Sequence, residues 1–285
     1  MVRADRIPPA LLVLAGVASV QLGAAFGKTL FDDVGPAGTV LLRQAFAALV
    51  LVLAWRPRIR GRSAADWRLV AVFGVVLATM NLSIYAAIDR IPLGIAVTIE
   101  FVGPLGVAVA GSRRALDLLW VALAAAGILL LSDFGTADLD LLGVLLALLA
   151  GCLWAAYILL AARVGQAFEG AQGLALAMAA GTVVTAPVGI ADGGAELLSP
   201  EVLAIGFAVA VLSSAIPYTL EMEALRRLPT GVFGVLMSLE PAMAALAGFI
   251  VLDEGLAAYE VVSIALVVTA SAGAARGARV PPRDA

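Results

Sequence analysis

Ten apolar runs, most of them about twenty residues long, follow one another along the chain with short polar linkers between them. A helix that crosses the hydrocarbon core of a bilayer needs roughly 20 mostly apolar residues, so runs of this length are typical of membrane spans. Hydrophobic residues make up 62% of the 285 positions and charged residues only 14%, whereas a soluble domain carries about 25% charged residues. We therefore expect an all-α integral membrane protein with ten transmembrane helices. The expected spans are Ala10–Leu30, Ala37–Trp55, Leu69–Ile88, Leu93–Gly111, Leu118–Ser132, Leu141–Ala161, Gly173–Ile190, Val202–Leu220, Thr230–Leu252 and Ala258–Ala275.

The charged residues divide between the two sides of the expected bundle. Lys and Arg gather in the cytoplasmic loops of membrane proteins, and this bias orients the spans. One side carries 15 of the 18 basic residues, namely Arg3, Arg6, Arg56, Arg58, Arg60, Arg62, Arg68, Arg113, Arg114, Arg163, Arg226, Arg227, Arg276, Arg279 and Arg283. The opposite side carries Lys28, Arg90 and the acidic residues Asp32, Asp33, Asp133, Asp138, Asp140, Asp192, Glu196, Asp253 and Glu254. This division predicts that both termini are cytoplasmic. The arginine-rich, lysine-poor composition is typical of a bacterium with a GC-rich genome, so we expect a multi-pass protein of the bacterial plasma (inner) membrane.

An internal repeat relates the two halves of the chain. Residues 87–94 resemble residues 224–231, and each segment carries Arg-x-Pro-x-Gly followed ten residues later by proline. The offset of 137 gives eight identities in 25 positions and covers five expected helices, which is an odd number. The second copy must therefore enter the membrane from the opposite face. We expect residues 1–135 and 136–285 to form two inverted five-helix repeats, a frequent plan of secondary transporters that bind substrate near the membrane midplane.

Three ionisable residues fall inside the expected spans: Arg43, Glu100 and Glu240. Each costs about 2.5–3.5 kcal/mol at the helix centre on insertion scales, so such residues usually have a function. Both glutamates are candidates to bind substrate or a proton, or else they hold neighbouring helices together. Arg43 is a candidate to hold a substrate carboxylate with both prongs of its guanidinium. It is equally a candidate to pair with Glu100 or to reach toward the acidic residues near the start of its span.

Two prolines and several polar or aromatic residues complete the set of candidates. Pro104 and Pro241 each free a carbonyl one turn earlier, because proline has no N–H, and they are candidates for helix breaks or gating. Further candidates for substrate contact are Gln21, Asn81, Tyr85, Trp154, Tyr157 and Tyr218. Trp154 and Tyr157 share one helix face, and ordinary packing is the favoured interpretation for them.

The absence of some residue types excludes several classes of function. The chain has no His and a single Cys, Cys152, so neither a disulfide nor a thiolate metal cluster forms within one chain. No phosphate-binding loop is present, which argues against ATP drive. We expect no catalytic residues, no metal, no cofactor and no nucleic acid. A membrane enzyme acting on lipid-linked substrates and a channel remain as alternatives.

Several motifs resemble the EamA group of the drug/metabolite transporter superfamily, and the resemblance covers essentially the whole chain. Ser238-Leu-Glu-Pro241, an alanine-rich helix and then Leu252-Asp-Glu254 resemble the ninth-span signature of that group. Arg90-Ile-Pro-Leu-Gly94 through Glu100-Phe-Val-Gly-Pro104, together with Ser214-Ala-Ile-Pro217, resemble its threonine/homoserine exporter branch. Asp253 departs from the pattern, because the group usually has glycine there.

The resemblance implies a secondary transporter that exports amino acids or related small metabolites, with threonine and homoserine as the first candidates. It also implies drive by the proton gradient and alternating access between two inverted halves. The expected partners are a small-molecule substrate, the lipid bilayer and protons, and a monomer suffices because two halves already make an inverted pair. A multidrug or other metabolite exporter is the alternative within the group.

Overall fold

The computed structural model describes residues 7–110, 115–133, 140–225 and 236–277. These residues form a bundle of helices, and no strand occurs among them. The elements are α1 (Pro9–Lys28), α2 (Phe31–Trp55), α3 (Ala64–Ile88), α4 (Leu93–Glu100), α5 (Val102–Ala110), α6 (Ala115–Asp133), α7 (Leu141–Ala167), α8 (Gln172–Gly193), the 3₁₀ turn η2 (Gly194–Leu198), α9 (Pro200–Ala210), the π-helical segment η3 (Val211–Ala215), α10 (Ile216–Leu225), α12 (Glu240–Leu252) and α13 (Ala258–Gly277).

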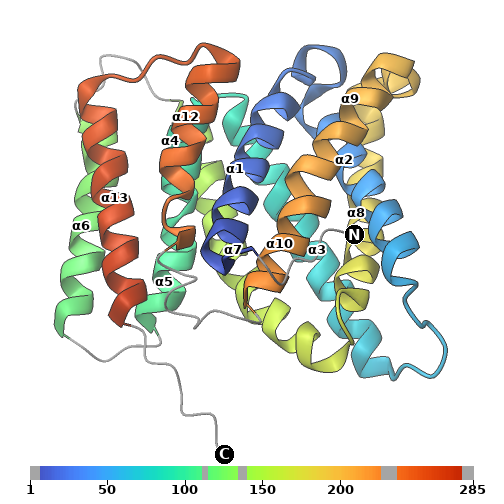
Figure 1. Ribbon diagram of the computed structural model, residues 1–285. Coiled ribbons are helices and arrows are strands. Elements are labelled where there is room, and N and C mark those ends of the chain that lie inside the picture. Colours follow the sequence, from blue (N-terminus) through green and yellow to red (C-terminus); the bar gives the residue numbers. More distant parts are fainter. Residues whose placement is uncertain (1–6, 111–114, 134–139, 226–235, 278–285) are drawn as a thin grey trace, which may run out of the picture.

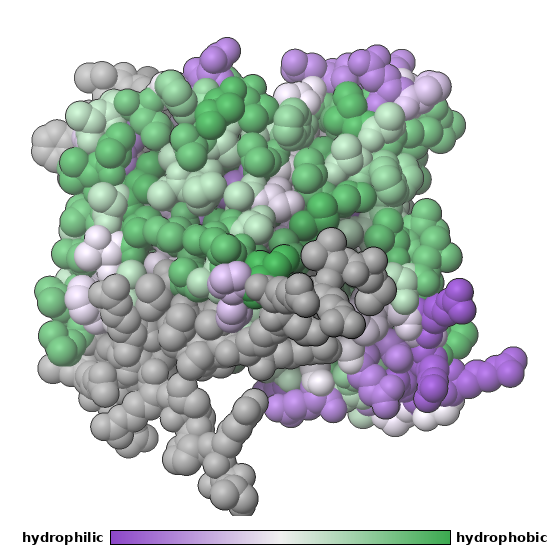
Figure 2. All heavy atoms as spheres, viewed as in Figure 1, coloured by the Kyte–Doolittle hydropathy of each residue, from purple (hydrophilic) through white to green (hydrophobic). Residues whose placement is uncertain are grey.

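The lengths and hydropathies of these helices agree with the expected membrane spans. Six helical stretches in the described part are long and apolar enough to cross a membrane, and four shorter apolar helices accompany them. Apolar side chains cover the middle of the molecule in Figure 2, and hydrophilic residues gather toward its two ends. The prediction of an all-α, multi-pass membrane protein is confirmed. The fifth span, predicted as the shortest, extends over Ala115–Asp133, while the first part of the ninth, Thr230–Val235, lies outside the described residues.

Two of the expected spans are interrupted beside the prolines singled out above. The fourth divides at Phe101 into α4 and α5, three residues before Pro104. In the ninth, α12 begins at Glu240, and Pro241 lies in its first turn, where a missing N–H costs nothing. Each interruption lies within three residues of one of these prolines, and a gating role for either proline stays a prediction.

Close helix contacts rely on residues with little or no side chain. α2 packs along α8, α3 along α7, α6 along α13, and α4 against α12 (Figure 1). A Cβ atom added to Gly94 of α4 would lie 2.8 Å from Cα of Ala245 in α12. A Cβ atom on Gly74 of α3 would lie 2.8 Å from the carbonyl oxygen of Ala177 in α8. Helix backbones approach this closely only where small residues face each other.

α4 lies at the centre of the bundle, since each of its residues is buried. α7, by contrast, exposes a row of leucines that includes Leu142, Leu145 and Leu149. A helix that is apolar all round and buried all round has protein on every side, whereas exposed leucines at helical spacing face lipid. Glu100, the last residue of α4, is thereby placed in the interior.

The two ends of the bundle differ in charge. One end, called the acidic end below, is formed by the end of α1, the end of α8 and the segment after α12, which contain Lys28, Asp192 and Glu254; the other, called the arginine end, is formed by residues 56–63 between α2 and α3 and by the last turns of α7, which contain Arg163 (Figure 1). At the acidic end α2 bends at Gly35, whose φ of 67° a residue with a side chain rarely adopts. Asp192 stabilises the bend, because its Oδ2 accepts a hydrogen bond from the backbone N–H of Ala37 at 2.9 Å.

Candidate functional site

A proline in the eighth span exposes two main-chain carbonyls inside the bundle. Pro217 has no N–H and therefore donates no backbone hydrogen bond. In α-helical geometry this bond would go to the carbonyl of Ser213, and in π-helical geometry it would go to the carbonyl of Leu212. Side chains from neighbouring helices satisfy both carbonyls. Ser19 of α1 donates to the Leu212 oxygen at 2.7 Å, and Arg43 of α2 donates from Nη2 to the Ser213 oxygen at 3.2 Å.

Arg43 is buried in a hydrogen-bonded network. Its Nη1 donates to Oδ1 of Asn81 at 2.7 Å, and its Nε donates to Oγ of Ser214 at 3.3 Å. Asn81 is oriented for this contact because its own amide group donates to the Leu77 carbonyl at 2.7 Å. The structure therefore brings together two residues singled out from the sequence, Arg43 and Asn81, and adds η3 as their third partner.

Arg43 interacts with Glu100 only at longer range. The ion pairs within the described residues are Lys28–Glu254 and Arg90–Asp140, so Arg43 is not in contact with a carboxylate there. An electrostatic interaction between Arg43 and Glu100 remains. Arg43 therefore does not form a direct ion pair with Glu100 within the described residues. Contact of Arg43 with a substrate carboxylate stays a prediction.

Two buried polar atoms beside Arg43 have no hydrogen-bond partner by geometry within the described residues. They are the hydroxyl of Tyr85 and Oγ of Ser213. The Tyr85 ring centroid lies 5.5 Å from Cζ of Arg43, and Ser213 supplies the carbonyl that Arg43 contacts. A buried polar group without a partner costs about 1–3 kcal/mol, so an acceptor-rich ligand would be stabilised here. We call Arg43, Tyr85 and Ser213 the donor cluster.

Three carboxyl groups come together from α4, α10 and α12. Glu100 is 7% exposed and Glu240 is 4% exposed, and Glu221 of α10 is half-buried. Glu240 interacts electrostatically with both of the others. Within the described residues, none of the three carboxyl groups takes part in a hydrogen bond. We call them the carboxyl cluster, and its proximity to the donor cluster follows from the interaction of Glu100 with Arg43.

Glu221 was missed by the sequence analysis. The eighth span was expected to end at Leu220, which placed Glu221 in a polar linker, but α10 continues to Leu225. A usable signal was present in the sequence. Glu221 follows Pro217 by four residues and therefore shares its helix face.

The aromatic candidates Trp154 and Tyr157 pack against neighbouring rings, and Tyr157 also interacts with the carboxyl cluster. Trp154 makes an edge-to-face contact with Phe101 at 5.4 Å between ring centroids, and Tyr157 stacks on Phe73 at 5.3 Å. These ring contacts agree with the packing interpretation favoured for both residues. Tyr157 also interacts electrostatically with Glu221 and Glu240.

Two further candidates are placed by the structure without a defined partner. Tyr218 is half-buried and interacts electrostatically with Arg43, Glu221 and Glu240, so it lies between the two clusters. Gln21 of α1 is 5% exposed, and no hydrogen bond of its side chain is seen within the described residues.

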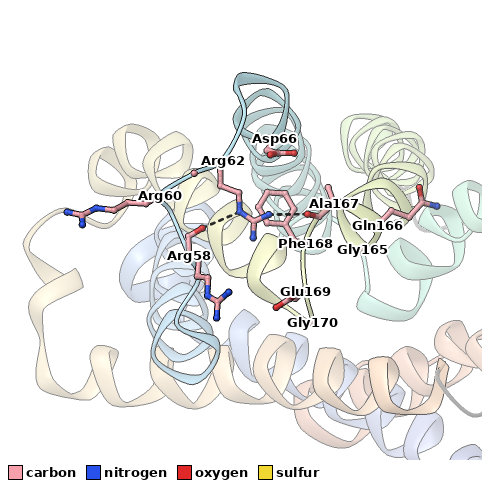
Figure 3. Close-up of a pocket in the computed structure, with 11 residues that line it drawn as sticks. Arg58, Arg60, Arg62, Asp66, Gly165, Gln166, Ala167, Phe168, Glu169 and Gly170 are labelled. Atoms are coloured by element: carbon pink, nitrogen blue, oxygen red, sulfur yellow. Dashed lines mark hydrogen bonds between the residues drawn. The ribbon is translucent and has the colours of Figure 1, made fainter.

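A separate groove of about 700 Å³ opens at the arginine end, between the α2–α3 and α7–α8 connections (Figure 3). Arg62 stacks over the Phe168 ring at 4.3 Å and donates to the carbonyls of Ala167 at 3.1 Å and Arg58 at 3.3 Å. The residues that line this groove belong to neither cluster. The donor cluster together with Glu100 and Glu240, and not this open groove, therefore forms the candidate substrate site. In the described part of the chain, no group of three or more His, Cys, Asp or Glu side chains is arranged to hold a metal ion.

Comparisons with known proteins identify relatives of this chain. The EamA-like transporter family matches residues 141–275. The threonine/homoserine exporter RhtA of Salmonella typhimurium is 42% identical over 278 residues, covering 96% of this chain and 94% of the relative. RhtA of Escherichia coli K12 is 43% identical over 268 residues, covering 93% and 90%. A crystal structure of a protein described without a function has a TM-score of 0.65 at 18% identity, covering 93% of this chain and 96% of the other, which shows the same fold.

Proposed function

The chain belongs to the EamA-like transporter family, and from this premise we propose that it exports threonine, homoserine or closely related amino acids across a bacterial inner membrane. The relatives named as threonine/homoserine exporters match almost the full length of the chain, which supports this substrate class. Residues that differ from those relatives would tune the choice among small amino acids.

One observation carries the proposal. The donor cluster, with a guanidinium and two hydroxyl groups without partners, interacts with a carboxyl cluster that accepts no hydrogen bond within the described residues. A zwitterionic amino acid carries one acceptor-rich carboxylate and one donor-rich ammonium group. We infer that the substrate carboxylate binds toward Arg43, Tyr85 and Ser213, and that the ammonium group binds toward Glu100 and Glu240.

The helix contacts support alternating access between two inverted halves, residues 1–135 and 136–285. If α1 corresponds to α7, α3 to α9–α10 and α4–α5 to α12, each major contact has a counterpart. The contact of α3 with α7 corresponds to that of α10 with α1, and the contact of α4 with α7 corresponds to that of α12 with α1. Such pseudo-symmetry lets each half adopt the conformation of the other, which exchanges outward-open and inward-open states.

Both termini are proposed to be cytoplasmic, because the order of the expected spans puts both termini and 15 of the 18 basic residues on the same side of the membrane. Drive by the proton gradient and function as a monomer are part of the same proposal. Proton exchange is supported by the buried carboxyl cluster, since ionisable groups at this depth commonly relay protons.

The character of the site favours a small zwitterion over the alternatives. A multidrug exporter would line its site with apolar and aromatic surface for cationic substrates. The buried groups here are instead charged or hydrogen-bonding, and the aromatic rings of Trp154 and Tyr157 are engaged in packing. A membrane enzyme acting on lipid-linked substrates would be favoured only by a chelator-sensitive activity.

Counterflow in proteoliposomes tests the proposal. Vesicles that contain the purified protein and unlabelled threonine should accumulate labelled threonine or homoserine with saturation. Glu240→Gln should abolish the exchange, whereas Glu201→Gln, the same change at an exposed position of α9, should leave it intact. If the folded protein exchanges no amino acid above empty vesicles, the substrate assignment is wrong.

A further inference from the structure

Resting on the proposed function, we propose that Glu221 carries the proton that is exchanged for the substrate, while Glu240 holds the substrate ammonium group. The two carboxyl groups would then divide the two tasks of a coupled transporter between α10 and α12. Neither the family match nor the names of the relatives assign a role to this position.

Glu221 lies at a close contact between α10 and α1. A Cβ atom added to Gly16 of α1 would lie 3.6 Å from Cγ of Glu221 and 3.7 Å from Cα of Pro217. The side chain of Glu221 is therefore placed against the α1 backbone. Val13, Val17 and Ala224 form part of an apolar cluster at the same pair of helices, so Glu221 borders apolar surroundings.

Within the described residues, no basic side chain interacts with Glu221 from the elements around it. The one charged residue of α1 is Lys28, at the acidic end. α12 presents Glu240, α7 presents Tyr157, and α10 itself adds Tyr218. These are the titratable groups that interact with Glu221 within the described residues, and each of them is acidic or phenolic.

Glu221 and Glu240 have no positive charge to balance them within the described residues. Arg43 interacts electrostatically with Glu100, which offsets one of the three carboxylates. Glu221 and Glu240 remain as two acidic groups that interact with each other in a low-dielectric interior. Two like charges cannot both be kept there at low cost, so a proton or an ammonium group must supply positive charge.

Position along the bundle decides which carboxyl group takes which cation. Glu240 interacts electrostatically with Glu100, which in turn interacts with Arg43 of the donor cluster that would hold the substrate carboxylate. Glu221 lies only four residues before Leu225, the end of α10. At 1.5 Å per residue it is about 6 Å from that helix end, on the side of the bundle that we propose is cytoplasmic.

The proposed cycle conserves protons and charge. When the site is open to the outside, one proton from external water binds a carboxylate oxygen of Glu221. When the site is open to the cytoplasm, the proton leaves to cytoplasmic water as the amino acid binds with its ammonium group at Glu240. One proton moves inward for each zwitterion that moves outward, and no covalent bond to the substrate forms or breaks.

Two assays on one preparation of proteoliposomes test the inference, with labelled threonine as the probe. Counterflow without a gradient reports substrate exchange, and transport under an imposed pH gradient reports coupling. Glu221→Gln should keep counterflow within about twofold of the unchanged protein and lose its acceleration by the gradient. Glu240→Gln should lose both activities, and Glu201→Gln should lose neither. Glu221→Asp, which restores a carboxyl group, should regain gradient dependence and thus exclude a merely structural role.

The outcomes separate the two proposals. If Glu221→Gln is accelerated by the gradient as strongly as the unchanged protein, the inference is wrong and the proposed function stands. The inference also fails if Glu221→Gln is monodisperse and loses counterflow, because Glu221 then takes part in substrate binding. If the unchanged protein exchanges no amino acid, the proposed function fails and the inference fails with it.

Discussion

The ammonium group of Lys28 lies 2.6 Å from Oε1 of Glu254, and the other carboxylate oxygen of Glu254 accepts a hydrogen bond from the backbone N–H of Leu93 at 2.9 Å. This one carboxylate joins the end of α1, the segment after α12 and the start of α4. The three elements therefore close the acidic end of the bundle together, beyond the buried clusters.

Removal of the Glu254 charge should loosen the acidic end. Glu254→Gln weakens the contact with Lys28, which is partly exposed, so the loss should be about 1 kcal/mol or less. We expect the melting temperature of the purified protein to fall by about 2–4 °C, as measured by thermal unfolding in detergent. Asp253→Asn, a similar change at an exposed neighbour, should have a smaller effect. Equal melting temperatures for all three proteins would argue that this contact does not hold the acidic end closed.

Arg43→Lys should impair transport although it keeps the charge. The guanidinium contacts Asn81, Ser213 and Ser214 through three separate nitrogens, and a single ammonium group cannot reach all three. We expect the rate of threonine counterflow to fall at least about tenfold. Transport at the unchanged rate would show that charge alone is required at this position.

A methyl group at Gly94 should separate α4 from α12. In Gly94→Ala the new Cβ would lie 2.8 Å from both Cα and Cβ of Ala245, so the helices must shift. Overpacking of this kind costs about 1–3 kcal/mol, which thermal unfolding should detect. Gly106→Ala is the matched control, because nothing lies within 4 Å of a Cβ atom there. If both variants unfold alike, the close approach of α4 and α12 is not as described.

The interaction of Asp140 with Arg90 should make stability depend on pH in the acid range. The hydrogen bond from Arg90 lowers the pKa of the Asp140 carboxyl, with help from the backbone N–H of Leu142. A folded pKa below the unfolded one stabilises the protein above the unfolded value, about 3.9, and this contribution is lost as the pH falls through the folded pKa.

Asp140→Asn isolates this contribution, because asparagine still caps the N-terminus of α7. The unchanged protein should melt higher than the variant at pH 6, and the difference should shrink as the pH falls toward 3. A difference that is the same at both pH values would mean that the charge of Asp140 contributes nothing to stability.

The overall fold could be predicted because its signals are local. Apolar length marks the spans, and Pro104 and Pro241 mark the breaks within two of them, since a missing N–H acts on its own helix. The partners of Arg43 could not be predicted, because Asn81 and Ser214 lie 38 and 171 residues away in the sequence. Glu221 was missed because the eighth span was expected to end one residue before it, and helix boundaries are the least reliable part of a sequence-based assignment.

The two carbonyls freed by Pro217 have a consequence for how this sequence can diverge. A residue with an N–H at position 217 would supply one backbone donor there, which would compete with Ser19 or with Arg43 for one of the two carbonyls. Selection on Ser19 and Arg43 is thus tied to an imino acid almost two hundred positions away. In an alignment of close relatives these three positions should change together, and a lineage that loses the proline should soon lose the serine as well.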